Sequence, residues 1–208
     1  MEASGAAPDT SPRAEPSGGS SPLPRFAVVD IETSGLSTRR HRILQIAVVT
    51  VEGGDVVDEW SSLIGLRWPW PIQRVGPRRV HGIGRKSLRG APRQRVVIGE
   101  LASRLDGAVF TAHNVRFDWP FIERAARQAG VAIVPAGRLC TLRLSRSLDP
   151  DRSLSHRLGD VCERYGISND RPHDALHDAR ATAAALPHLL AEHRVNGPDD
   201  LGPLYERR

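Results

Sequence analysis

Apolar residues in the first half of the chain gather in short continuous runs, which is the pattern that buried strands produce. Residues 26–30 form one compact run, and residues 43–51 form a longer one. Two adjacent glycines separate the second run from residues 56–64, which favours a β-hairpin. Residues 108–112 form another short apolar run. The pattern therefore predicts four strands, of which the second and third are neighbours.

Apolar positions in the second half recur mostly at the spacing of an α-helix. Pro120 stands just inside one expected helix start, and Gly130 follows the expected end of that helix. Strands followed by strands that alternate with helices indicate an α/β fold with a mixed sheet. We predict helices over residues 96–105, from about Pro120 to Ala129, and over 139–147, 154–165 and 175–193.

The length of 208 residues suits one domain with terminal extensions. Residues 1–24 are rich in serine, proline, glycine and alanine, with few apolar anchors. Such a segment cannot bury enough surface to offset the entropy of ordering, so we predict a disordered tail. The folded domain is expected over residues 25–193, and residues 194–208 are expected to form a short C-terminal tail.

The formal net charge of +5 favours polyanionic partners such as nucleic acids. Lys86 is the only lysine, however, and abundant arginine, alanine, glycine and proline also result from a GC-rich genome, so charge alone leaves both explanations open. Residues 66–95 hold nine Lys or Arg, no acid and two tryptophans. We hypothesise that this basic stretch adds salt-sensitive affinity for nucleic acid.

The cysteines and the hydropathy of the chain favour a cytoplasmic protein. Cys140 and Cys162 lie in apolar surroundings without a CxxC spacing, which indicates buried packing residues in a reducing compartment. No apolar run approaches the ~20 residues that span a bilayer, so no membrane partner is expected. The N-terminus also lacks the features of a signal peptide.

Two carboxylates lie close together on the first predicted strand. Asp30 and Glu32 are separated by one residue, so their side chains leave the same face of the strand. Two such acids on a central apolar strand repel each other unless a cation lies between them, and hard cations such as Mg²⁺ or Mn²⁺ prefer oxygen ligands. We therefore favour metal binding over a solvated strand edge.

A histidine and three acids stand near the starts of two predicted helices. Asp118, taken alone, is most simply a helix N-cap. Asp174 is a natural N-cap of the last helix, and Asp178 lies about one turn inside it. Helical side chains tilt toward the N-terminus, so Asp178 is expected to point back toward His173 at the mouth of the helix.

Three motifs in order resemble the DEDDh, or DnaQ-like, 3′–5′ exonucleases. They are residues 30–36 (Asp-Ile-Glu-Thr-Ser-Gly-Leu), residues 113–118 (His-Asn-Val-Arg-Phe-Asp), and His173 with Asp178. Each motif alone is weak, but all of them in order with compatible gaps are specific. The sequence looks like the proofreading branch, typified by the epsilon subunit of bacterial DNA polymerase III. The resemblance implies a ribonuclease-H-like fold with a central mixed five-stranded sheet flanked by helices.

The resemblance also implies a two-metal-ion hydrolysis of phosphodiester bonds. Asp30, Glu32, Asp118 and Asp178 would hold two Mg²⁺ or Mn²⁺ ions, and His173 would be the general base that takes a proton from the attacking water. The substrate would be nucleic acid with a single-stranded or frayed 3′ end, DNA in preference to RNA, and the products nucleoside 5′-monophosphates. The residues expected to contact substrate are Thr33, Gly35, Leu36, His81, Asn114 and Phe117.

Two alternatives stay open beside this hypothesis. Oligoribonuclease relatives usually carry methionine where this chain has Thr33, so exoribonuclease activity on short RNA is the less favoured reading. A non-catalytic nucleic-acid-binding or polymerase-accessory module would be favoured by loss of a catalytic residue, yet all five are present. The C-terminal arm by which the epsilon subunit binds its polymerase is not recognisable, which favours a free-standing proofreading or repair exonuclease and leaves a polymerase contact unsupported.

Overall fold

The computed structural model describes residues 22–65 and 75–207. Residues 1–21, most of the predicted disordered tail, lie outside these ranges, as do residues 66–74 with both tryptophans of the basic stretch. The strands are β1 (Phe26–Thr33), β2 (Ile43–Glu52), β3 (Asp55–Leu63), β4 (Val109–Ala112) and β5 (Gly137–Cys140). The helices are α1 (Arg78–His81), α2 (Arg85–Leu88), α3 (Gln94–Leu105), α4 (Val115–Ala129), α5 (Thr141–Ser147), α6 (Leu158–Arg164), α7 (Ala175–Glu192) and a 3₁₀ helix (Pro198–Leu204).

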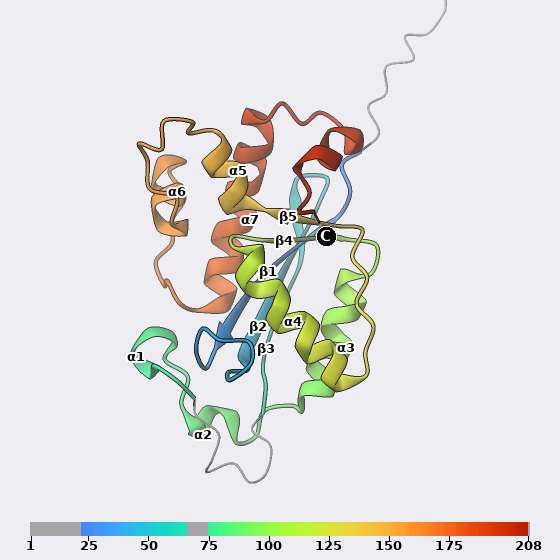
Figure 1. Ribbon diagram of the computed structural model, residues 1–208, viewed down its shortest axis with the longest axis vertical. Helices are drawn as coiled ribbons and strands as arrows, with labels where there is room; N and C mark the ends of the chain where they lie inside the picture. The colour runs from blue at the N-terminus through green and yellow to red at the C-terminus, as the bar shows by residue number, and fades with distance from the viewer. Residues whose placement is uncertain (1–21, 66–74, 208) are drawn as a thin grey trace, which may run out of the picture.

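The strands form one mixed sheet in the order β3-β2-β1-β4-β5, with β1 at its centre (Figure 1). The first three strands are an antiparallel meander, since β1 pairs antiparallel with β2 and β2 with β3. β4 lies parallel to β1, and β5 lies parallel to β4. The predicted hairpin and the predicted mixed five-stranded sheet are therefore confirmed.

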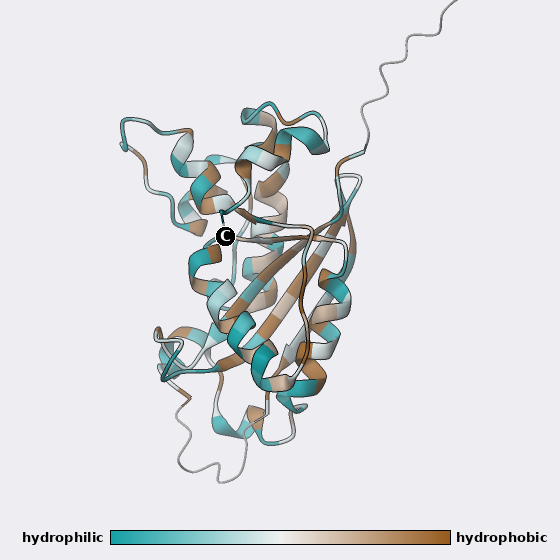
Figure 2. Ribbon diagram, turned by 45° about the vertical axis from the view of Figure 1, so that its right-hand side comes forward, coloured by the Kyte–Doolittle hydropathy of each residue, from teal (hydrophilic) through white to brown (hydrophobic). Residues whose placement is uncertain are grey.

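Helices cover both faces of this sheet. Ala27, Val29 and Ile31 of β1 pack in a core with α3 and α4, whereas Phe26 and Val28 pack in a second core with α7. Figure 2 shows hydrophobic strands through the middle of the molecule and more hydrophilic residues on the outer helices. Because strand residues alternate between faces, the residues of β1 that follow Val28 at every second position face the α7 side.

The start of α4 differs from the sequence prediction. The helix begins at Val115, with Asn114 as its N-cap, five residues before Pro120. Asp118 is therefore not an N-cap but lies in the first turn, where its side chain is buried. Pro120 lies inside the helix, in its second turn, where it has no N–H to donate to the carbonyl of Arg116, so the prediction that it marks the helix start is wrong.

Two other predicted helices are shorter than expected. Leu139 and Cys140 belong to the edge strand β5, which the hydropathy pattern did not separate from the helix that follows it. Helix α6 begins at Leu158 rather than Leu154, because Asp149 organises the preceding segment as a loop. Its carboxylate accepts hydrogen bonds from the main-chain amides of Ser153 and Leu154, at 3.1 and 2.9 Å, which competes with helix formation.

The described part of the basic stretch contains two single-turn helices, α1 and α2, which the sequence did not predict. Gly76 leads into α1 with a φ of +73°, and a Cβ added there would lie 2.3 Å from the carbonyl oxygen of Ser34. The α1 segment therefore adjoins the turn that follows β1. No helix in the described parts of the chain is long and apolar enough to cross a membrane.

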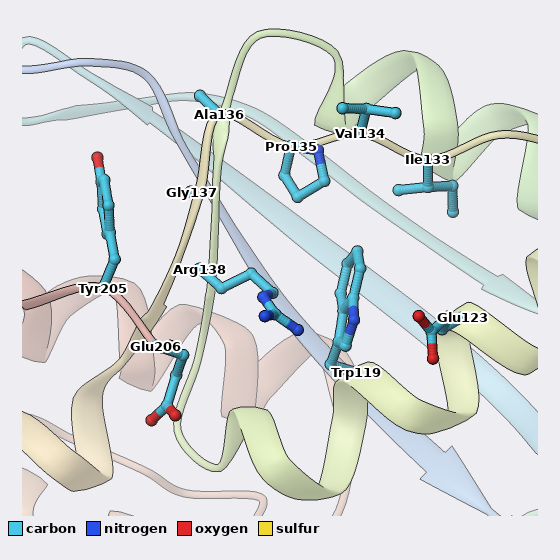
Figure 3. A pocket seen from close by; sticks show the side chains of 10 residues that line it. All are labelled: Trp119, Glu123, Ile133, Val134, Pro135, Ala136, Gly137, Arg138, Tyr205 and Glu206. Carbon is cyan, nitrogen blue, oxygen red and sulfur yellow. The ribbon is translucent and has the colours of Figure 1, made fainter. Parts of the chain in front are cut away.

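Residues after the last long helix pack against the sheet edge. Leu201 is fully buried, and Tyr205 forms an antiparallel bridge with Leu139 of β5. Within the segment that the sequence predicts as a short C-terminal tail, Tyr205 and Glu206 therefore pair with β5 through Leu139 and Arg138. Trp119, Arg138, Tyr205 and Glu206 line a pocket of about 490 Å³ beside β5 that contains none of the predicted catalytic carboxylates (Figure 3).

Candidate active site

The central strand β1 carries the first pair of carboxylates. Asp30 and Glu32 share the face of β1 that is turned toward α7, and they pair with Ala47 and Gln45 of β2. A register shift follows directly between Glu32 and Thr33, where the strand gives way to a turn. The two side chains consequently stand side by side at the C-terminal end of the strand.

A third carboxylate reaches the same region from α4. Helix α4 follows β4, which pairs in parallel with residues 26–28 of β1 and so ends near the middle of β1, shortly before Asp30. The first turn of α4 comes close enough to Asp30 for the charge of Asp118 to act on it. Asp118 is buried in that turn. Burial, with the negative charge of Glu32, raises the pKa of Asp118 to about 8, although main-chain hydrogen bonds at Asp118 and Ile31 oppose the shift.

The mouth of α7 supplies the fourth carboxylate and the histidine. Asp174 caps the helix, since its Oδ1 accepts hydrogen bonds from the amides of Leu176 and His177 at 3.0 and 3.4 Å. Asp178 is buried one turn inside and turns back, and its Oδ2 accepts a hydrogen bond of 2.9 Å from the amide of His173. The arrangement predicted for the helix mouth is present: His173 precedes the helix and is exposed, with a φ of +69°.

Three of these side chains form a compact set of potential metal ligands. One ligand atom each from Glu32, His173 and Asp178 lies within 4.8 Å of the other two. Asp30 and Asp118 are not members of this three-residue set, but the charge of Glu32 acts on both of them. Burial, then the charges of Asp118, Asp178, Glu32 and Asp174, raise the pKa of Asp30 well above its usual range.

The electrostatics of this cluster fit a divalent cation. Burial and the charges of Asp178 and Asp174 raise the pKa of Glu32 to about 7. Within the described residues, neither Arg nor Lys forms an ion pair with Asp30, Glu32, Asp118 or Asp178. Uncompensated desolvated carboxylates are costly, and oxygen-rich sites of this kind suit Mg²⁺ or Mn²⁺.

Three of the residues predicted to contact substrate lie in or next to the turn that follows β1, and they differ in their exposure to solvent. Leu36 projects into solvent with 83% of its surface exposed, directly after the carboxylate strand. Thr33 is buried, and its hydroxyl donates a hydrogen bond of 2.9 Å to the carbonyl of Gly35. Packing alone explains why glycine occupies position 35, because a Cβ there would lie 2.6 Å from the ring of His41.

The other predicted contact residues lie on two separate segments. Asn114 is exposed at the start of α4, and Phe117 is half-buried with its ring centroid 5.3 Å from that of Phe121. His81 is buried at the end of α1, where its Nδ1 accepts a hydrogen bond of 3.0 Å from the amide of Ile83. Its Nε2 has no hydrogen-bond partner within the described chain, which leaves one buried polar atom available to a ligand.

One residue near the carboxylates escaped the sequence analysis. Asn169 lies in the loop between α6 and α7, and its amide donates a hydrogen bond of 3.2 Å to Oδ1 of Asp178. Both oxygens of Asp178 are therefore held by protein donors, one from Asn169 and one from His173. No periodic pattern or motif marks Asn169, since a loop residue reaches this position only through the fold.

A family model described as exonuclease, RNase_T, matches residues 27–186. The PolC-type DNA polymerase III of Staphylococcus saprophyticus is 31% identical over 169 residues, covering 80% of this chain and 11% of that protein. The 3′-5′ exonuclease DinG of Bacillus subtilis is 30% identical over 171 residues, covering 82% of this chain and 18% of that protein. This chain thus spans less than a fifth of the length of either relative.

Solved structures of two exonucleases have the same fold. Exonuclease X in complex with 5′ overhanging duplex DNA superimposes with a TM-score of 0.64 at 24% identity, covering 86% of this chain and 99% of that one. Escherichia coli exonuclease I in complex with a dT13 oligonucleotide superimposes with a TM-score of 0.66 at 18% identity, covering 82% of this chain and 43% of that one. The mixed sheet with helices on both faces is the architecture that these structures share with this chain.

Proposed function

The chain belongs to the RNase_T exonuclease family, and on that premise we propose that it is a metal-dependent 3′–5′ exonuclease that shortens DNA from its 3′ end. The observation that carries the proposal is the convergence of Asp30, Glu32, Asp118 and Asp178 from three elements, with His173 beside Glu32 and Asp178. The 3′-5′ direction is supported by the relative DinG. DNA as substrate is supported by the complexes of exonucleases X and I with DNA.

Each residue of the site has a role in this proposal. Asp30, Glu32, Asp118 and Asp178 would hold two Mg²⁺ or Mn²⁺ ions, which supply positive charge for the scissile phosphate and for the water that attacks it. His173 accepts the proton of that water through its imidazole. The new bond forms between the water oxygen and phosphorus, and the bond from phosphorus to the 3′ oxygen of the preceding nucleotide breaks.

The residues around the carboxylates orient the 3′ end. Asp178 and Asn169 hold the mouth of α7, and the amide of His173 ties the proposed base to Asp178. We assign contact with the terminal nucleotide to the turn of Thr33, Gly35 and Leu36, and to His81, Asn114 and Phe117. The exposed side chain of Leu36 is suited to an apolar contact with a base.

The test compares 3′-labelled single-stranded DNA, mismatched duplex DNA and single-stranded RNA of one length, each with Mg²⁺, Mn²⁺ or EDTA. We expect the label to be released from DNA as a nucleoside 5′-monophosphate with either metal and retained with EDTA. Asp30→Asn is the matched inactive control, since it keeps the size of the side chain. Faster digestion of RNA would reassign the substrate, and binding without release of label would indicate a non-catalytic module.

A further inference from the structure

A basic cleft lies beside the candidate active site. We use the name basic cleft for the surface formed by α5 and residues 149–157. Two concavities of about 600 and 450 Å³ adjoin here and share Arg146, Leu154 and His156 in their walls. The larger is also lined by Arg152, and the smaller by Arg157 and Asn114. The cleft therefore runs from the start of α4 outward across α5.

The arginines of the cleft are available to an anionic ligand. Arg146, Arg152 and Arg157 are exposed, and none of them forms an ion pair with a carboxylate in the part of the chain that the structure describes. Arg143, which lines the larger concavity, instead forms an ion pair, because its Nε lies 3.6 Å from Oε1 of Glu206. Asp151 is the one exposed acid within residues 149–157, since Asp149 is buried, so three exposed arginines stand against one exposed carboxylate.

The loop that carries these arginines is held in a defined shape. Oδ1 of Asp149 accepts hydrogen bonds from the amide and the hydroxyl of Ser153, and its Oδ2 accepts one from the amide of Leu154. His156 adds contacts of 3.1 Å to Asp149 and 2.8 Å to Ser145 of α5. A loop anchored in this way loses little entropy when it binds a ligand.

This anchoring continues into the candidate active site. Nε2 of His113 lies 2.9 Å from the carbonyl oxygen of His156, and its Nδ1 lies 3.0 Å from the hydroxyl of Thr141. His113 directly precedes Asn114, the N-cap of the helix that carries Asp118. Burial lowers the pKa of His113, whereas its hydrogen bond to the main chain of His156 and the charge of Asp178 act against that shift.

We propose that the basic cleft binds the phosphate backbone of the substrate strand on the 5′ side of the nucleotide that is removed. This inference rests on the proposed exonuclease function. A strand whose 3′ end lies at the carboxylates must leave the site past an adjoining surface, and guanidinium groups bind phosphates through paired hydrogen bonds. Leu154, half exposed among the arginines, offers an apolar contact to a base of that strand.

The test uses a double variant of the full-length chain, Arg146→Gln with Arg157→Gln. Binding of a 3′-blocked, non-hydrolysable 12-nucleotide single strand is measured by fluorescence anisotropy between about 50 and 300 mM salt. Each phosphate contact contributes about 0.7 to the salt slope for single strands, so the loss of two should lower the slope by about 1.4. We expect binding about 10-fold to 100-fold weaker at low salt.

The control is Arg127→Gln with Arg194→Gln, which removes the same formal charge from two exposed arginines that line neither concavity. Arg127 differs from the cleft arginines in having an ion pair, with Glu123 at 3.2 Å. An equal loss of affinity in this control would show an effect of net charge alone and would overturn the proposal. An unchanged salt slope in the cleft variant would also overturn it. So would weakened binding of a recessed 3′ duplex with normal binding of single strands, because the cleft would then bind the complementary strand.

A minimal substrate separates this inference from the proposed function. The p-nitrophenyl ester of thymidine 5′-monophosphate reports the hydrolytic step without an upstream strand, and the cleft variant should hydrolyse it at the wild-type rate. Failure of the wild-type protein itself to hydrolyse any of these substrates would contradict the proposed function. The salt slope would still report on the cleft, because binding does not require hydrolysis.

Discussion

The main-chain amide of His173 donates a hydrogen bond of 2.9 Å to Oδ2 of Asp178. This bond ties an exposed histidine to a buried carboxylate across the first turn of α7. It also holds His173 at a φ of +69°, where a residue with a side chain is uncommon and strained. The helix mouth therefore keeps the imidazole near Glu32 and Asp178 at some cost to the backbone.

Replacement of His173 by glycine should separate catalysis from stability. Glycine occupies positive φ without strain, so His173→Gly should leave the free energy of unfolding unchanged or raise it by up to about 1 kcal/mol. Turnover on single-stranded DNA at neutral pH should fall about 10²-fold to 10⁴-fold, the usual contribution of a positioned base. The control is His177→Gln one turn away, and equal losses in both variants would argue against His173 as the base.

The metal-free protein should become less stable as pH rises. The pKa of Glu32 is raised to about 7 and that of Asp118 to about 8, so the folded protein binds more protons than the unfolded chain above about pH 4. The stability associated with these protons is fully present below the unfolded pKa values and is lost as pH rises through about 7 and 8. Thermal unfolding in EDTA between pH 5 and 8.5 measures the decline, which Mn²⁺ should reduce. If a Glu32→Gln variant lost stability with pH as the wild type does, Glu32 would not be a cause of the decline.

Asp30→Asn should abolish hydrolysis and stabilise the metal-free fold. The substitution removes a proposed metal ligand and also the charge that burial and the surrounding acids disfavour. At pH 8 in EDTA we expect a gain on the order of 1–3 kcal/mol, measured by denaturant unfolding. Asp55→Asn, at an exposed position on β3, is the control and should change little. Substantial activity in a folded Asp30→Asn protein would remove Asp30 from the proposed site.

Asn169→Ala should weaken activation by metal without unfolding the protein. Asn169 positions Asp178 through one hydrogen bond, so its loss should raise the Mn²⁺ concentration for half-maximal activity by about 3-fold to 30-fold. The maximal rate at saturating Mn²⁺ should change less than that concentration does. If the maximal rate fell while the Mn²⁺ concentration for half-maximal activity stayed the same, the effect of Asn169 on activity would not arise from its hydrogen bond to Asp178.

Gly35→Ala should destabilise the turn that follows β1. The backbone has a φ of +150°, and the added methyl group would lie 2.6 Å from the ring of His41. We expect a loss of about 1–3 kcal/mol in the free energy of unfolding. Gly99→Ala is the control, because that glycine lies inside α3 with open space around it and should gain up to about 1 kcal/mol. A neutral Gly35→Ala would show that the ring of His41 moves aside freely.

Much of the architecture follows from local pattern. The apolar runs of β1 and β2 and the turn between β2 and β3 specify the meander, because alternation and turn residues act over a few neighbouring positions. The cap of α7 was predictable for the same reason, since Asp174 bonds only to residues two and three positions ahead. The start of α4 was misplaced because its N-cap, Asn114, makes no side-chain capping bond and Pro120 gave the stronger local signal.

The sequence by itself determined the order of the carboxylate motifs, the same-face placement of Asp30 and Glu32, and the backward tilt of Asp178 toward His173. Each of these depends on backbone geometry over a few residues. The tertiary structure alone decided that Asp118 is buried in the first turn of α4 rather than capping the helix, that Asn169 supports Asp178, and that Arg146 and Arg157 share a concavity with Asn114. These relationships join segments that are far apart in the chain, so they depend on how β1, α4, α5, α7 and the loop of residues 149–157 pack against one another.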